Sequence, residues 1–294
     1  MDENTRLSDE QPEKPKKLKR HFIIWVLLLG FVMLLLGQIL GEMICLPLIR
    51  LAGDRGDIQF ALMYLSFIGI HIVVLLFCLL WEKPAFRSFW HLKQGGGKGN
   101  TFKMLGLGLL IGIVMNGACI LIAWLHGDLD LSMGLFHPGY LLFALACVFV
   151  QSAAEELLTR GYMMKTLGER YGVWVAAIAN SLFFGALHLM NTGITVLSFL
   201  NIVAIGFALS LVMIYFDSLW LCAALHTGWN FTQSLLFGLP NSGIVSQSSW
   251  FHLEGAKGSL CYDPVFGVEG TIVAVIVICV FGLLVFLRGR KQKA

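Results

Sequence analysis

Eight long apolar runs dominate the sequence and limit what it can fold into. A helix needs about 20 mostly apolar residues to cross a bilayer. A soluble domain has about 25% charged residues, whereas this chain has 13% charged and 57% hydrophobic residues. The sequence therefore predicts an all-α, polytopic membrane helix bundle of about eight transmembrane helices. The runs cover about residues 22–44, 58–81, 104–125, 139–159, 173–190, 196–216, 219–238 and 269–287.

The basic residues predict the orientation of such a bundle. Most of the 21 Lys and Arg residues lie in segments 1–20, 82–103, 160–171 and 288–294, which an eight-span arrangement places on one side. Cytoplasmic loops are enriched in Lys and Arg, so we expect both termini in the cytoplasm. These basic segments need no partner other than the lipid bilayer, and a net charge of +3 gives no reason to expect nucleic-acid binding.

Acidic residues at the end of the fourth run are the first functional signal. A charge at the bilayer centre costs at least about 2.5–3.5 kcal/mol, and it commonly marks a functional site. Residues four apart share a helix face, so Glu156 is expected to pair with Arg160 while Glu155 points elsewhere. A carboxylate without a partner in apolar surroundings suits a general base. The alternative is an interfacial helix end with solvated charges.

Two further runs each contain a histidine four residues from a second side chain on the same helix face: Phe184 with His188, and His226 with Asn230. An imidazole and an amide on one helix face can donate two hydrogen bonds to a developing oxyanion. Each pair alone also fits a polar contact between helices. With Glu155, however, they match a centre in which a carboxylate and one imidazole accept a proton from water.

The same side chains also match a metal site. Glu155, His188 and His226 could form a His/His/Glu zinc site with an open fourth position. The HExxH helix signature of many zinc proteases is absent from the sequence. Both a metal-free mechanism and a divalent metal such as zinc therefore remain open here.

The three motifs resemble those of the CPBP family, which contains CAAX prenyl proteases and Abi proteins. The family pattern is EExxxR, then FxxxH, then HxxxN/D, and the matching segment covers about residues 145–235. The corresponding residues are Glu155-Glu156-xxx-Arg160, Phe184-xxx-His188 and His226-xxx-Asn230.

This resemblance implies a CAAX-protease-like intramembrane endopeptidase. It implies that Glu155 and His188 activate water and that His226 and Asn230 form the oxyanion hole. It also implies a supporting role for the other motif residues, Glu156, Arg160 and Phe184. No cofactor is expected, and zinc is the alternative.

The expected substrate is a peptide or membrane protein, with lipidated proteins and bacteriocin or signal-peptide precursors as candidates. The expected location is the plasma (inner) membrane of a prokaryote. We divide the chain into a basic N-terminal segment (1–20), transmembrane helices 1–3 (21–137), a protease-like core (138–240), and an external loop with the last helix and a basic tail (241–294). The alternatives are a non-catalytic immunity or scaffold protein and a proton-coupled transporter.

The depth of the two motif histidines adds a geometric expectation. His188 lies much further into its run than His226 does, if the two runs begin where the apolar pattern suggests. We therefore expect the fourth helix to continue past Arg160 towards Leu167, and the fifth to begin after a turn near Tyr171. Buried asparagines, such as Asn116, Asn180 and Asn201, are interpreted as contacts between helices. Cys45 and Cys261, both in expected external loops, are candidates for a disulfide.

Overall fold

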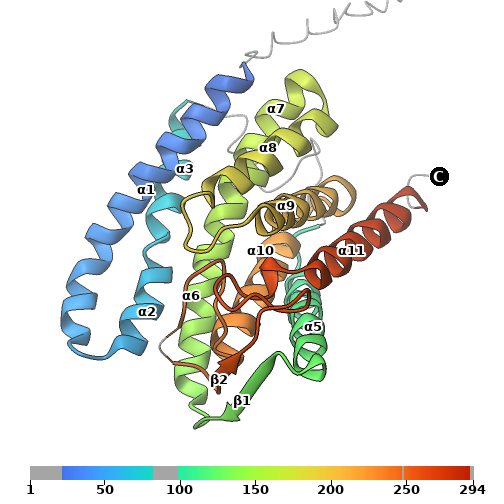
Figure 1. The fold of residues 1–294 in the computed structure, drawn as a ribbon. Helices are drawn as coiled ribbons and strands as arrows, with labels where there is room; N and C mark the ends of the chain where they lie inside the picture. The colour runs from blue at the N-terminus through green and yellow to red at the C-terminus, as the bar shows by residue number, and fades with distance from the viewer. Residues whose placement is uncertain (1–21, 82–98, 247, 292–294) are drawn as a thin grey trace, which may run out of the picture.

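A computed structural model describes residues 22–81, 99–246 and 248–291. The basic N-terminal segment, most of the 82–103 loop and the end of the basic tail lie outside these residues. The described part is a bundle of helices with one small two-stranded sheet at the end away from α7 (Figure 1). The prediction of a polytopic helical membrane bundle is therefore confirmed.

The elements follow the apolar runs of the sequence. In chain order they are α1 (Ile23–Ala52), α2 (Gly56–Leu65), α3 (Ile68–Leu80), α5 (Phe102–His126), β1 (Leu129–Met133), α6 (Pro138–Glu156), η1 (Leu157–Met163), α7 (Met164–Tyr171), α8 (Val173–Leu187), α9 (Val196–Phe216), α10 (Leu219–Phe231), η2 (Thr232–Leu236), β2 (Phe251–Ala256), η3 (Val268–Gly270) and α11 (Ile272–Lys291).

All eight apolar runs are helical, but they are not equally long. Six helical segments in the described part are long and apolar enough to cross a membrane: 23–52, 56–80, 102–126, 138–171, 196–216 and 272–291. The other two runs form the shorter helices α8 and α10, of 15 and 13 residues, so the eight predicted runs comprise six long helical segments and two short helices. The chain is a multi-pass membrane protein, and two shorter helices complete the bundle.

The fourth helical segment extends to Tyr171, as the depth argument predicts. It consists of α6, the π-helical segment η1 and α7 in uninterrupted succession. Gly172 then ends it with a positive φ of 84°, a conformation that glycine adopts without steric cost. This extension buries Glu156 and Arg160, whose side chains are 0% exposed.

Glycines bring two pairs of helices into backbone contact. A Cβ added at Gly37 or Gly41 of α1 would collide with the backbone of Ile70 or Ser66 beside it. A Cβ at Gly112 of α5 would collide with the carbonyl oxygen of Leu225 in α10. Small residues allow close helix approach inside membranes, so α1 packs on α2–α3 and α5 on α10.

The segment expected as an external loop is more structured than the sequence indicates. Its strand β2 pairs antiparallel with β1, and Tyr262 and Phe266 are fully buried. Cys45 and Cys261 are both free, so the candidate disulfide is absent.

The buried asparagines join helices as expected. The Nδ2 atoms of Asn116 and Asn180 donate to Gln233 Oε1 at 2.7 Å and to Ser210 Oγ at 3.0 Å. These bonds connect α5 with η2 and α8 with α9.

Candidate active site

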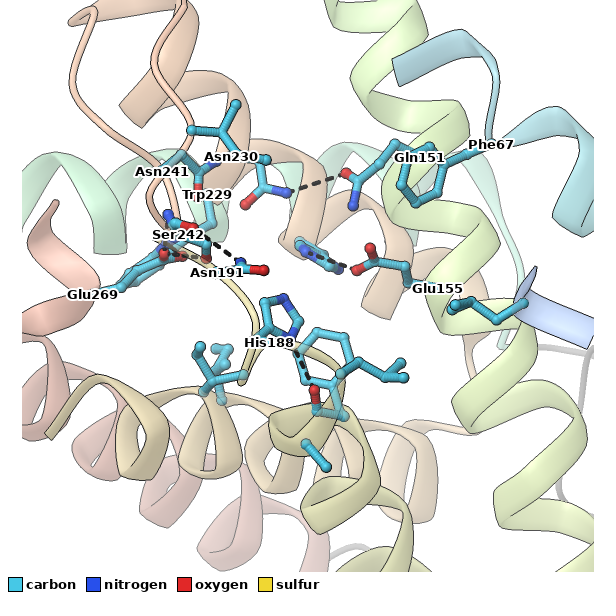
Figure 2. A pocket seen from close by; sticks show the side chains of 18 of the residues that line it. Phe67, Gln151, Glu155, His188, Asn191, Trp229, Asn230, Asn241, Ser242 and Glu269 are labelled. Carbon is cyan, nitrogen blue, oxygen red and sulfur yellow. Dashed lines mark hydrogen bonds and ion pairs between the residues drawn. The ribbon is translucent and has the colours of Figure 1, made fainter. Parts of the chain in front are cut away.

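One cavity of about 680 Å³ collects the side chains of the three motifs. Glu155, His188, His226 and Asn230 all line it, with Phe184 beside the histidines. Its wall is mostly apolar along α1 and α8 and mostly polar along the segment after residue 240. Figure 2 shows Glu155 on one side, Glu269 on the other, and His188 between them. The structure thus brings together four residues from three separate apolar runs.

A buried ion pair between Glu156 and Arg160 lies next to the cavity residue Glu155. Arg160 Nη1 donates to Glu156 Oε1 at 3.0 Å, and both side chains are 0% exposed. Arg160 Nη2 also donates to the carbonyl oxygen of Gly206 in α9 at 2.8 Å. A buried charge without a partner is strongly destabilising, so this pair neutralises Glu156 and anchors the helix that carries the motif.

Glu155 is the acid that remains available to the cavity. It lies one residue before Glu156, so it projects about 100° away from it around the helix. Its side chain is 15% exposed, and Oε2 lies 3.8 Å from His226 Nε2. The sequence argument that separates the roles of the two adjacent acids therefore agrees with the structure.

His226 lies between the two carboxylates. Its Nδ1 is 3.1 Å from Glu156 Oε1, so Nδ1 carries the proton and donates to that carboxylate. The other ring nitrogen, Nε2, faces Glu155 and the cavity. A hydrogen bond at one imidazole nitrogen fixes the role of the other, and Glu156 therefore orients His226.

His188 is oriented by the helix that it ends. It follows the last residue of α8, and its Nδ1 lies 2.8 Å from the carbonyl oxygen of Phe184 (Figure 2). Carbonyl groups at a helix end lack partners within the helix, and this contact satisfies one of them. Since Nδ1 donates its proton there, a neutral His188 keeps the lone pair of Nε2 for a ligand in the cavity.

Phe184 packs against both histidines and the arginine. Its ring centroid lies 4.9 Å from that of His188 and 6.0 Å from that of His226. The Arg160 guanidinium lies over the same ring, 4.8 Å from the centroid. Phe184 is 3% exposed, and its ring separates His188, His226 and Arg160.

Asn230 faces the cavity one turn after His226. Its Nδ2 donates to Gln151 Oε1 at 3.2 Å, which links α10 to α6 (Figure 2). Gln151 was missed by the sequence analysis, although its position four residues before Glu155 places it on the same helix face.

A second group of polar residues was also missed because it comes from distant parts of the chain. Glu269, in η3, accepts hydrogen bonds from Trp229 and Ser242. Asn191, shortly after His188, donates to the carbonyl oxygen of Ser242 at 2.9 Å. The one sequence signal for this group was Glu269 itself, an acid at the start of the last apolar run.

The zinc alternative stays a prediction, and the clustering of possible metal ligands bears on where an ion could bind. Among the described residues, His126, Asp128 and Cys261 form a group whose possible ligand atoms all lie within 4.8 Å of one another. That group lies outside the cavity lining. The alternative zinc ligands do not form such a group: Glu155, His188 and His226.

The fold is that of a multi-pass helical membrane protein whose cavity collects the residues of the three motifs. Residues 137–232 match the family described as type II CAAX prenyl endopeptidase Rce1-like. This match confirms the resemblance drawn from the three motifs, and the family is one of proteases. No curated protein matches the chain.

Proposed function

We propose that the protein is an intramembrane endopeptidase, and that Glu155 activates water to hydrolyse a peptide bond. The observation that supports this most is the position of Glu155. It is a partly exposed carboxylate 3.8 Å from His226 Nε2, next to a second carboxylate that is already neutralised by Arg160. Such separation of two adjacent acids gives one a structural role and leaves the other for proton transfer.

The proposed reaction begins with a water molecule between Glu155 and His188. Glu155 accepts one proton, the acceptor Nε2 of His188 holds the water, and the water oxygen bonds to the carbonyl carbon of the peptide. The carbonyl oxygen becomes an oxyanion, which His226 Nε2, when protonated, and Asn230 Nδ2 stabilise by donating hydrogen bonds. The C–N bond then breaks, and the proton on Glu155 passes to the leaving nitrogen.

The proposed substrate is a membrane protein or a membrane-associated peptide. The cavity lies within a helical membrane bundle, and apolar side chains of α1 and α8 contribute to its wall, among them Phe31, Leu35, Phe183 and Leu187. This supports a substrate that is itself partly apolar, including lipidated proteins and bacteriocin or signal-peptide precursors. The proposed location is a prokaryotic plasma membrane.

The proposed mechanism uses no metal. We expect full peptide cleavage after dialysis against a strong chelator, because the donors and acceptors described above suffice for each proton transfer. Loss of activity on dialysis, with recovery on addition of zinc, would contradict this mechanism.

The function is tested with the full chain in detergent and a mixed peptide library, with cleavage products identified by mass spectrometry. We expect cleavage by the wild type and a loss of about 10²-fold or more in Glu155→Gln and His188→Ala. Glu42→Gln is the matched control, because Glu42 also lines the cavity but is exposed. Equal cleavage by wild type and Glu155→Gln would contradict the role of Glu155, and no cleavage by either protein would favour a non-catalytic scaffold.

A further inference from the structure

Glu269 is an acid in the cavity that belongs to none of the three motifs. It lies outside residues 137–232, which match the family, and reaches the cavity from η3, just before α11. Figure 2 shows it across the cavity from Glu155. The proposed reaction does not use this carboxylate, so its presence needs another explanation.

The partners of Glu269 are all uncharged. Oε1 accepts from Trp229 Nε1 at 3.0 Å, and Oε2 accepts from the backbone nitrogen and Oγ of Ser242 at 2.8 and 2.5 Å. No Lys or Arg is among the described residues that line the cavity. A carboxylate offers about four acceptor positions, so capacity remains for a donor from the cavity.

Burial raises the pKa of Glu269 above its ordinary value, and the hydrogen bond from Ser242, the nearby His188 and the hydrogen bond from Trp229 oppose this rise. A positive ligand beside the carboxylate favours its ionised form. The free energy that burial costs the charged acid is thus partly recovered when a cation binds.

A second acceptor without a partner lies at the same end of the cavity. Asn201 of α9 is 1% exposed and lines the cavity. Its Nδ2 donates to the backbone oxygen of Glu269 at 2.7 Å, while its Oδ1 has no hydrogen-bond partner in the part of the chain that is described. Buried polar atoms are nearly always hydrogen-bonded, so the unpaired Oδ1 of Asn201, on a side chain that holds the backbone of Glu269, indicates a missing donor.

The end of the cavity at Glu269 is held at a fixed position relative to His188 and Asn230. Trp229 directly precedes Asn230 and holds Glu269 Oε1. Asn191, three residues after His188, holds the carbonyl oxygen of Ser242. A group bound at Glu269 therefore has a defined distance from both catalytic helices.

We propose that Glu269, with Asn201, forms a subsite for the positively charged side chain of a Lys or Arg residue in the peptide substrate. This proposal rests on the proposed function, because it assumes that the cavity binds a peptide. A guanidinium group carries several donors in a planar fork that suits a carboxylate and a second oxygen. The subsite selects substrates by charge, whereas the apolar wall selects them by hydrophobicity.

The test measures binding to the full-length Glu155→Gln protein in detergent, which removes the catalytic acid and keeps the subsite. The probes are fluorescent N-acyl-Leu-Arg amide and its citrulline counterpart, a neutral analogue of nearly the same shape. We expect the arginine peptide to bind about tenfold more tightly. Adding Glu269→Gln should abolish this preference, whereas adding Glu42→Gln should preserve it.

Two results would overturn the subsite: equal affinity for the two peptides, or a preference that survives Glu269→Gln in a folded protein. The peptide comparison needs no change at position 269, so equal affinity refutes the proposal even where that variant does not fold. Because binding is measured without catalysis, a failure here is separate from a failure of the cleavage assay.

Discussion

At the scale of single residues, the site depends on giving different surroundings to similar side chains. Glu155 and Glu156 are chemically identical neighbours, yet one is 15% exposed to the cavity and the other is 0% exposed against Arg160. The two histidines differ in the same way, since His226 donates to a carboxylate and His188 to a backbone carbonyl. The roles follow from these contacts.

The buried pair predicts a large effect on stability. Arg160→Met leaves the buried Glu156 without its cationic partner, with only the hydrogen bond from His226, so we expect a loss of about 3–5 kcal/mol in the free energy of unfolding. Denaturant unfolding in detergent measures it. The control is Arg50→Met, because Arg50 is exposed at the end of α1.

The double variant Glu156→Leu with Arg160→Met should recover part of this loss, because it removes the buried carboxylate as well. It should remain inactive, since His226 then lacks the carboxylate that orients it. A single Arg160→Met variant as stable as the wild type would show that the pair does not hold the helix.

The motif residues were predictable because their relations are local. A spacing of four residues places Glu156 with Arg160, and Phe184 with His188, on one helix face whatever the rest of the fold does. Glu269 was not predictable, because its partners Trp229 and Ser242 lie 40 and 27 residues away. Such contacts depend on how the chain returns to the cavity, which no local pattern records.

At the scale of elements, glycines determine which helices lie in backbone contact. The apolar runs predicted that helices form, but runs that are apolar on all sides do not indicate which faces meet. The close approach of α5 to α10 is a property of Gly112 opposite Leu225. This contact supports the helix that carries His226 and Asn230.

Gly112→Val should therefore destabilise the protein by about 1–3 kcal/mol or more, because its side chain collides with the α10 backbone. The matched control is Gly106→Val in the same helix, where an added Cβ meets nothing within 4 Å. Thermal melting in detergent compares the two. Similar melting temperatures for both variants would contradict the packing argument.

A hydrogen bond between Asp128, just before β1, and Ser259, after β2, helps to hold the two-stranded sheet together. Ser259 Oγ donates to Asp128 Oδ2 at 2.5 Å, and this bond lowers the pKa of Asp128 below its ordinary value of 3.8. The ionised form is thus favoured by folding. Its contribution to stability is present above pH 3.8 and is lost as the pH falls through the lowered pKa.

We accordingly expect Asp128→Asn to increase hydrogen exchange in residues 251–262 at pH 7, relative to the wild type. Well below pH 3.8 the difference should shrink, because the wild-type carboxyl is then protonated too. A difference that does not change with pH would assign the effect to packing.

At the scale of the whole molecule, the cavity needs more of the chain than the family match covers. Residues 137–232 supply the three motifs. The lining of the cavity also includes Phe31 and Gln38 of α1, Tyr64 of α2, and Glu269. The proposed division into a core and flanking segments therefore describes where the motifs lie, while the cavity is built from the bundle as a whole.

The orientation inferred from basic residues predicts a labelling pattern in intact cells. A membrane-impermeant maleimide should react with Cys261, which is partly exposed beside the sheet. A cysteine introduced by Ser8→Cys should react only after the membrane is permeabilised. Cys45 is buried and serves as an internal control. The reverse pattern would place both termini outside the cell.

The π-helical segments η1 and η2 follow directly after Glu156 and shortly after Asn230. A π turn behaves as a helix with one extra residue inserted, so it rotates all later side chains of that helix about the helix axis. Deleting one residue from either segment would restore a regular helix without shortening it by a full turn. The residues after the deletion would then be rotated about the helix axis relative to those before it, so we expect a stable protein in which the cavity side chains no longer meet.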